Sequence, residues 1–181
     1  GVANGFSCCL LAGKKDIMRL GGIDHEKERV FLISTTHGAE THALAAALAA
    51  VKTIQETGLV ERNKKLGVVL RAGLEAMIKD MGLSDHITIK GDPSWLLMQF
   101  RDAQKALCDG FKTLVMQESV KHGMLFRGSF VFSLAHGHKE IDKTLRIFKK
   151  ILKTYKAAIA RGSYAQFLVG EPVRPVFRQW N

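Results

Sequence analysis

The sequence predicts an α/β fold in which helices alternate with short strands. The first indication is the apolar run at residues 30–33, whose β-branched and aromatic side chains lack helical spacing, as in a buried strand. Small residues follow this run and predict a helix over residues 39–57, which Gly58 would end. The second indication is the region after residue 59, where amphipathic helical patterns alternate with short apolar runs.

The remaining elements are predicted from their own patterns and from the glycines that separate them. Apolar residues at intervals of three and four predict helices, whereas apolar runs and strict alternation predict strands. The expected strands are residues 6–12, 86–90, 95–100, 124–126 and 130–134, and the expected helices are residues 14–20, 59–81, 104–122 and 139–161.

We expect two parts in the chain, residues 1–57 and residues 58–181. The first part has two strands and one long helix, too few to form a domain, because the edges of its sheet would stay uncovered. The second part alternates helices with pairs of strands, which predicts a small α/β domain with a partly antiparallel sheet. We therefore expect the chain to lack a segment that completes the first part.

The composition is that of an ordinary globular protein, with 46% hydrophobic and 24% charged residues. No apolar run approaches the roughly 18–20 residues that a membrane-spanning helix needs, and the N-terminal segment lacks the order of a signal peptide. Cys8, Cys9 and Cys108 give no disulfide framework. These features predict a reduced, cytoplasmic protein with no membrane partner.

The formal net charge of +10 has two interpretations. The lysines are spread over several predicted helices, without interleaved aromatic residues or zinc-finger spacing. Solvated helix faces therefore explain the charge, and nucleic acid is not expected as a partner. The alternative is a stand-alone basic binding module for phosphate-rich partners.

The junction between the strand at residues 30–33 and the helix that follows is the main candidate site. Thr35 and Thr36 place hydroxyl groups at the helix start, where backbone N–H groups lack helical partners. Such a helix start binds anions, so the pair is suited to the phosphate of a cofactor. The alternative is that both threonines only cap the helix.

The histidines predict no metal site. His37 and His42 lie five residues apart, which places their rings on different faces of a helix, unlike the three- or four-residue separation of metal ligands. His136 and His138 fall in a predicted turn before the last helix, where we expect a structural role. No metal is therefore expected.

Four segments of the chain together resemble a known family. They are GVANGF at residues 1–6, AGKKDIM at residues 12–18, STTHGAET at residues 34–41, and FSLAH at residues 132–136 followed by EIDKTL at residues 140–145. In this order they are similar to the C-terminal portion of the class III pyridoxal-phosphate-dependent aminotransferases, and most of all to the glutamate-1-semialdehyde 2,1-aminomutase branch.

The resemblance implies an enzyme of fold type I that moves an amino group through an aldimine of pyridoxal 5'-phosphate and acts as a homodimer. Residues 1–57 would be a remnant of the cofactor-binding large domain with a connecting helix, and residues 58–181 the C-terminal small α/β domain. In the family a lysine that forms the Schiff base directly precedes the segment that matches Gly1. We therefore expect no catalytic residue in this chain and no activity of the fragment alone; Lys14 and Lys15 match an ordinary surface-helix start.

The resemblance also implies roles for individual residues. Thr36 matches the threonine that binds the cofactor phosphate of the neighbouring subunit, and Thr35 would add a backbone contact. Arg127 is a candidate for a substrate carboxylate, although an exposed, solvated arginine is the alternative. Aminomutases carry an acidic residue near the position of Gly128, so transferase and aminomutase activities both stay open. The His37 segment indicates a small amino-acid or amino-sugar type of substrate.

Overall fold

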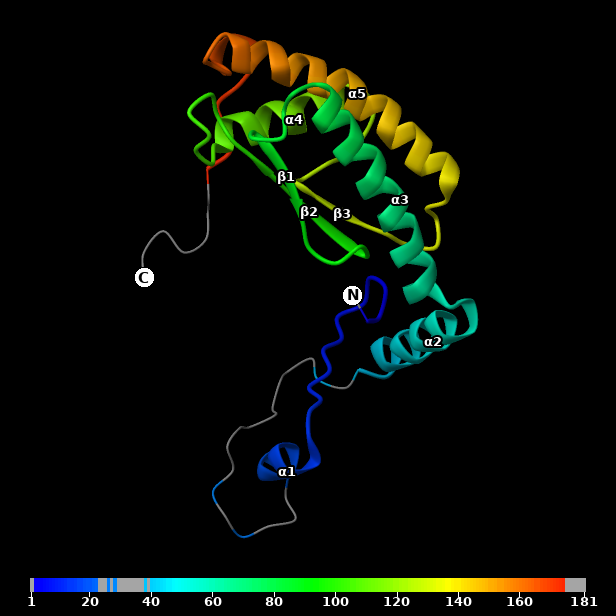
Figure 1. Ribbon diagram of the computed structural model, residues 1–181. Coiled ribbons are helices and arrows are strands. Elements are labelled where there is room, and N and C mark those ends of the chain that lie inside the picture. The colour runs from blue at the N-terminus through cyan, green and yellow to red at the C-terminus, as the bar shows by residue number, and fades with distance from the viewer. Residues whose placement is uncertain (1, 23–25, 27, 29–37, 39, 175–181) are drawn as a thin grey trace. The chain divides into compact units, whose positions relative to one another are not determined.

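The computed structural model describes residues 2–22, 26, 28, 38 and 40–174. The chain divides into two compact units, Gly1–Gly58 and Leu59–Asn181, and each is described by itself (Figure 1). The strand expected at residues 30–33 lies outside the described residues, as do Thr35 and Thr36. The assignment of residues 1–57 to a cofactor-binding domain stays a prediction.

The first unit is built mainly of helices in its described part. A short helix, α1 (Lys15–Met18), continues into the 3-10 turn η1 (Arg19–Gly21), which agrees with the helix expected over residues 14–20. The long helix α2 (Thr41–Thr57) confirms the helix expected before Gly58. Gly58 has a φ of 59°, and its N–H donates to the carbonyl of Ile54, so the chain leaves the helix through a left-handed cap.

The strand predicted at residues 6–12 is wrong. This segment is irregular, and the side chains of Phe6, Leu10 and Leu11 are all more than half exposed. An apolar run indicates a buried strand only if a neighbouring strand completes the backbone hydrogen bonds. The described part of the first unit contains no strand with which this segment pairs.

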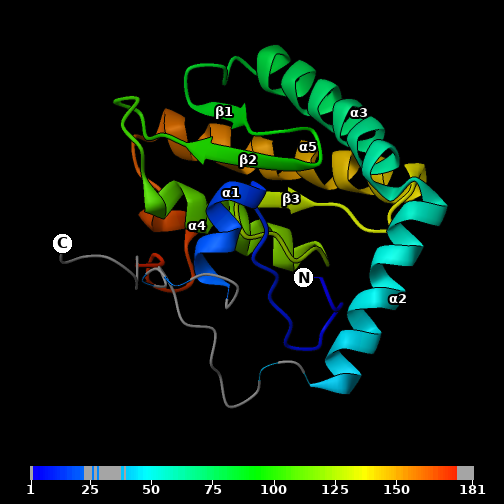
Figure 2. The same ribbon diagram turned by 90° about the horizontal axis from the view of Figure 1, so that it is seen from below.

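The second unit is a three-stranded antiparallel sheet with three long helices on one side. The strand order is β1-β2-β3, and α3, α4 and α5 cover the same face (Figures 1 and 2). This agrees with the small α/β unit expected from the sequence. In chain order the elements are α3 (Leu59–Asp80), β1 (Ile87–Lys90), β2 (Trp95–Phe100), α4 (Asp109–Lys121), β3 (Ser129–Val131), α5 (His138–Ala160) and the 3-10 turn η2 (Ala165–Phe167).

The core lies between the sheet and the helices. On β2, Leu96, Met98 and Phe100 alternate with exposed or half-exposed residues and point into the core, because successive side chains of a strand face opposite sides. Phe100 is opposite Ile87 of β1, so the register brings two buried side chains together. The helices contribute side chains that are 0 or 1% exposed, among them Leu70, Leu74, Phe111, Leu114, Phe148, Ile151, Leu152 and Tyr155.

The helix predicted over residues 104–122 begins five residues later than expected. The side chain of Asp102 accepts the N–H of Gln104 at 2.9 Å and so stabilises a turn. The N–H of Cys108 then donates to the carbonyl of Phe100, which holds this segment beside the end of β2. Local side-chain hydrogen bonds of this kind compete with helix formation, and α4 begins only after them.

The last two predicted strands are only partly present. Residues 124–126 form no strand, and β3 occupies residues 129–131 instead of 130–134. Beyond β3 the carbonyl of Phe132 accepts a hydrogen bond from the Asn63 side chain on α3, at 3.1 Å. Ser133 and His136 then form a turn in which the Ser133 N–H donates to His136 Nδ1 at 3.0 Å. These bonds replace the ladder partners that a longer strand would need.

Within the described part of the chain, no single helix is long and apolar enough to cross a membrane. The helices α2 and α3 meet that criterion only when they are taken together.

Candidate functional site

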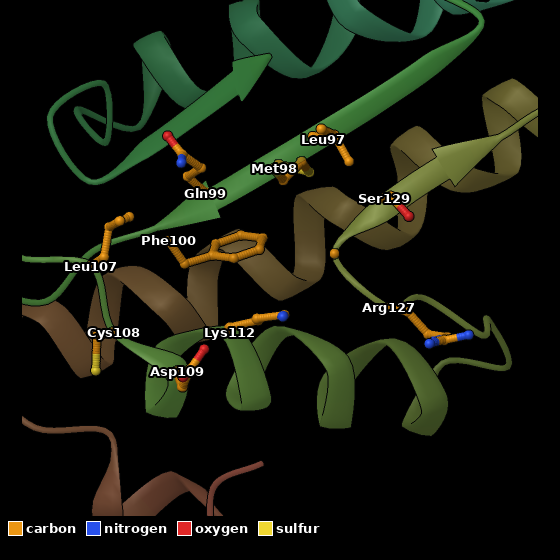
Figure 3. Close-up of a pocket in the computed structure, with 11 residues that line it drawn as sticks. Leu97, Met98, Gln99, Phe100, Leu107, Cys108, Asp109, Lys112, Arg127 and Ser129 are labelled. Carbon is orange, nitrogen blue, oxygen red and sulfur yellow. The ribbon is translucent and has the colours of Figure 1, made fainter. Parts of the chain in front are cut away.

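A cavity of about 310 Å³ lies at the edge of the sheet in the second unit (Figure 3). Its walls come from the end of β2, the start of α4 and the segment that leads into β3. A second cavity of about 220 Å³ shares Asp109, Lys112 and Arg127 with the first. The first cavity is lined by Leu97, Met98, Gln99, Phe100, Leu107, Cys108, Asp109, Lys112, Arg127, Gly128 and Ser129.

The short length of β3 creates this cavity. The paired residues of β3 reach only as far as Leu97 of β2. Beyond that point the N–H of Met98 donates to the carbonyl of Gly128 at 2.8 Å, and the carbonyl of Phe100 accepts the N–H of Cys108 at 3.0 Å. The stretch of β2 between these two hydrogen bonds forms the floor of the cavity. The cavity is therefore a small polar space that backbone atoms and apolar side chains surround.

Two cations reach this cavity from different elements. Lys112 extends from α4 and is half-buried, whereas Arg127 extends from the loop before β3 and is exposed (Figure 3). Gly128 has a φ of 94°, and a Cβ built there would lie 3.2 Å from Lys112 Cε and 4.0 Å from Lys112 Nζ. The end of the Lys112 side chain therefore lies next to Gly128, which directly follows Arg127 in the chain.

Neither cation is neutralised within the structure. Among the described residues, the side chains of Lys112 and Arg127 have no hydrogen-bond or ion-pair partner. Four described lysines form ion pairs, among them Lys105 with Asp85 at 2.7 Å and Lys121 with Glu118 at 2.7 Å. Unpaired cations at a concave, partly apolar surface are available to a ligand.

The C-terminal segment runs along α4 and completes the second cavity. Gln117 acts as a clamp, because its side-chain N–H donates to the carbonyl of Phe167 at 2.8 Å and its side-chain oxygen accepts the N–H of Val169 at 2.8 Å. Further along, the N–H of Val173 donates to the hydroxyl of Thr113 at 2.9 Å. These bonds bring the next residue of the segment to the cavity.

That residue is Arg174, which lines the second cavity as a third cation beside Lys112 and Arg127. Its guanidinium is exposed and pairs with Glu171 at 2.8 Å. Asp109 is the acidic residue among the lining side chains, against the cations Lys112, Arg127 and Arg174. The combined lining is therefore positively charged and suited to an anion.

Of the three site residues expected from the sequence, the structure describes only Arg127. Arg127 lines both cavities, which fits a role in binding an anionic group. Thr35 and Thr36 lie outside the described residues, and their proposed contact with phosphate stays a prediction. Lys112 could not be recognised from the sequence, because a lysine within a helical pattern is typical of a solvated helix face.

The histidines occupy local structures. His42 Nε2 lies 3.4 Å from a carboxylate oxygen of Glu40 at the start of α2, where His42 is exposed and Glu40 is half-buried. His136 belongs to the turn with Ser133, and His138 begins α5. No group of three or more histidine, cysteine or acidic side chains in the described ranges is placed to hold a metal ion.

Solved structures with this fold are pyridoxal-phosphate-dependent transaminases. A transaminase with PLP bound superposes with a TM-score of 0.68 at 19% identity and is matched over 82% of this chain and 35% of its own. An omega-transaminase from Sphaerobacter thermophilus has a TM-score of 0.65 at 19% identity, over 83% of this chain and 35% of its own. The chain therefore has the fold of the corresponding part of a transaminase of fold type I.

The curated relatives include an aminomutase and an aminotransferase. Glutamate-1-semialdehyde 2,1-aminomutase of Thermomicrobium roseum is 32% identical over 130 residues, which are 66% of this chain and 29% of the relative. Acetylornithine aminotransferase of Caldanaerobacter subterraneus subsp. tengcongensis is 26% identical over 152 residues, 84% of this chain and 36% of the relative. No protein-family model matches the chain.

These relatives confirm the resemblance found in the sequence. The chain is similar to the C-terminal portion of the class III pyridoxal-phosphate-dependent aminotransferases and aminomutases. It spans about a third of the length of the curated relatives it matches, from 29% to 38%. None of these relatives is a nucleic-acid-binding module, so the alternative function of a stand-alone basic module has no support.

Proposed function

We propose that this chain is the C-terminal part of a pyridoxal-phosphate-dependent enzyme that transfers an amino group between small amino-acid or amino-sugar substrates, or moves it within one molecule. The observation that carries the proposal is the aminomutase relative with 32% identity over 130 residues of the chain. Pyridoxal phosphate supplies the electron-withdrawing group that this chemistry needs. The residues of this chain would bind and orient the reactants.

The cofactor contact is proposed for the phosphate group alone. The hydroxyl and the backbone N–H of Thr36 would donate hydrogen bonds to the phosphate of the cofactor held by the partner subunit of a homodimer. Thr35 would add a contact from its backbone. The described lysines of the first unit, Lys14, Lys15 and Lys52, are exposed. They do not provide the buried amine that Schiff-base chemistry requires. The family resemblance implies that this lysine directly precedes Gly1.

Arg127 is proposed as the residue that binds the substrate carboxylate. A guanidinium presents paired N–H donors that match the two oxygens of a carboxylate. Its position at the mouth of a cavity with apolar walls fits this role, because contact with a carboxylate there would exclude part of the surrounding water. The free cysteines Cys8, Cys9 and Cys108 fit the reducing, cytoplasmic setting that we propose.

The test is to read and express the complete reading frame that contains this chain. We expect a lysine codon directly before that of Gly1, and amino-group transfer that requires added pyridoxal phosphate. Arg127→Gln should raise KM for carboxylate substrates about tenfold or more, since a hydrogen bond to a charged group contributes about 1.5–3 kcal/mol. An exposed lysine far from the cavity, changed as Lys149→Gln, is the control.

Two results would refute the proposal. One is a reading frame with a residue other than lysine in the position before Gly1. The other is a complete protein that binds pyridoxal phosphate but neither transfers an amino group from any amino acid or amino sugar tested nor moves one within it.

A further inference from the structure

His136 lies in the turn between β3 and α5, and its ring accepts a hydrogen bond from the backbone. The N–H of Ser133 donates to His136 Nδ1 at 3.0 Å, and the Ser133 hydroxyl lies 3.0 Å from the same nitrogen. A backbone N–H can only donate, so Nδ1 carries a lone pair and the ring proton sits on Nε2. The hydrogen bond that closes this turn therefore exists only while the imidazole is uncharged.

His86 shows the opposite arrangement. Its Nδ1 lies 2.8 Å from the carbonyl oxygen of Asp102. A carbonyl can only accept, so this Nδ1 carries the proton, and a second proton added at Nε2 leaves the bond intact. Protonation thus keeps the hydrogen bond of His86, whereas it breaks that of His136.

The turn closed by His136 is also the place where α3 holds the segment between β3 and α5, which runs beside that helix (Figure 1). The guanidinium of Arg62 donates to the carbonyl of Ser133 at 3.3 Å and to the carbonyl of His136. Asn63, on the same helix, donates to the carbonyl of Phe132 at 3.1 Å. Opening of the turn would move these acceptors and weaken the attachment of this segment to α3.

The charged groups around His136 come from two helices. Arg62 approaches from α3. His138, Lys139 and Glu140 stand at the start of α5. Apart from Glu140, the cavity of about 140 Å³ that His136 lines has uncharged side chains from the sheet, the helices and the loop after α4.

Of these groups, only the histidines change charge near neutral pH. A backbone N–H at the start of α5 donates to the Glu140 carboxylate at 2.8 Å and holds the pKa of that carboxyl below 4.5. Glu140 therefore keeps its charge between about pH 5 and 8, the range in which imidazoles ordinarily titrate. Lysine and arginine stay charged throughout that range.

We propose that the turn of residues 133–136 is a pH-sensitive latch, closed by the neutral imidazole of His136 and released when that ring is protonated. Protonation at Nδ1 removes the acceptor of the Ser133 N–H and adds a positive charge to a turn that already holds the Arg62 guanidinium. Release would loosen the end of β3 and open the small cavity beside it. The stability that the latch provides is present above the titration range and lost as pH falls through it.

Asparagine at residue 136 separates the hydrogen-bond acceptor from the charge. In His136→Asn the side-chain oxygen takes the place of Nδ1, so the Ser133 N–H keeps an acceptor, but the residue cannot be protonated. His136→Ala removes both the acceptor and the charge. His122→Asn is the matched control, because His122 follows the C-terminal end of α4, where a positive charge is favourable.

Nuclear magnetic resonance of the wild-type chain follows the Ser133 amide and the His136 ring from pH 8 to pH 5. The two signals should shift with one common midpoint. Urea denaturation at both pH values gives the unfolding equilibrium constant, which should rise about fivefold more for the wild type than for His136→Asn, as expected for the loss of one hydrogen bond. His136→Ala should be less stable than the wild type at pH 8 and should lack the same part of the acid decline, whereas His122→Asn should keep it.

The inference is overturned if the His136 ring titrates without a change at the Ser133 amide, or if the wild type and His136→Asn lose equal stability between pH 8 and pH 5. The first measurement needs only the wild-type chain, so it decides the question even if a variant fails to fold. The latch does not depend on the function proposed above, because neither measurement involves cofactor or turnover.

Discussion

The Tyr155 hydroxyl holds the end of β2 to α5, and its removal provides a defined test of how the sheet and this helix pack. Tyr155 is 0% exposed. Its O–H donates to the carbonyl of Arg101 at 2.5 Å and lies 3.3 Å from that of His86, while the N–H of Arg101 donates to the hydroxyl oxygen at 3.1 Å. Tyr155→Phe deletes these contacts and keeps the ring.

The expected cost follows from which groups lose their partner. The N–H of Arg101 also donates to the carbonyl of His86 at 2.8 Å, so both of these groups keep a hydrogen bond in the variant. The carbonyl of Arg101 loses the Tyr155 donor. One backbone acceptor left without its partner at a half-buried residue corresponds to about 1–2 kcal/mol. The free energy of unfolding should fall by that amount.

Urea denaturation and thermal melting measure this change. For a chain of 181 residues the melting temperature should fall by about 3–6 °C. Phe111→Leu, which alters ring packing against Tyr155, is the comparison, because it should cost stability without affecting these hydrogen bonds. An unchanged stability for Tyr155→Phe would show that the hydroxyl does not hold β2 to α5.

Alkaline pH gives a second measurement on the same side chain. Burial raises the pKa of the Tyr155 phenol above its ordinary value of 10.0. Above pH 10 the unfolded chain therefore releases a proton that the folded chain keeps, and stability falls as pH rises. Tyr155→Phe should lack this part of the alkaline decline. If the stability of Tyr155→Phe fell above pH 10 as steeply as that of the wild type, the decline could not be assigned to Tyr155.

Two further changes test the helices. Gly67→Ala should lower the free energy of unfolding by about 3 kcal/mol, because the added Cβ would lie 1.7 Å from the carbonyl oxygen of Pro93. Gly170→Ala is the control and should be nearly neutral, because there is open space around Gly170. Equal effects of the two changes in urea unfolding would show that no close contact exists at residue 67. Glu140 accepts the N–H of Gly137 at 2.8 Å, and this bond holds the pKa of its carboxyl below 4.5. The contribution of the Glu140 carboxylate to stability is therefore present at neutral pH and lost on acidification. Glu140→Gln should lower the urea midpoint at pH 7 and leave it unchanged near pH 3. An equal decrease at both pH values would refute the capping role.

The sequence was sufficient to predict the elements that have strong periodicity. The helices α3 and α5 were expected within two residues of their observed bounds, and the strand expected at residues 95–100 coincides with β2. Long amphipathic helices bury one continuous face, so their apolar spacing determines both their type and their ends.

The elements that depend on partners could not be predicted in the same way. Residues 6–12 have the composition of a strand, but composition does not provide a neighbouring strand. The start of α4 depends on the carboxylate of Asp102, whose turn competes with the helix pattern. The candidate site shows the same limit. Arg127 could be proposed from family resemblance, whereas Lys112 became visible only because α4 packs beside Gly128.

The strand order of the second unit has a consequence for folding kinetics. A short turn links β1 to β2, so this hairpin closes a small loop and can form within microseconds. Pairing of β3 with β2 must wait for closure of a loop that contains the whole of α4. The cavity between them is therefore among the last features to assemble, and amide hydrogen exchange should detect its opening before that of the hairpin.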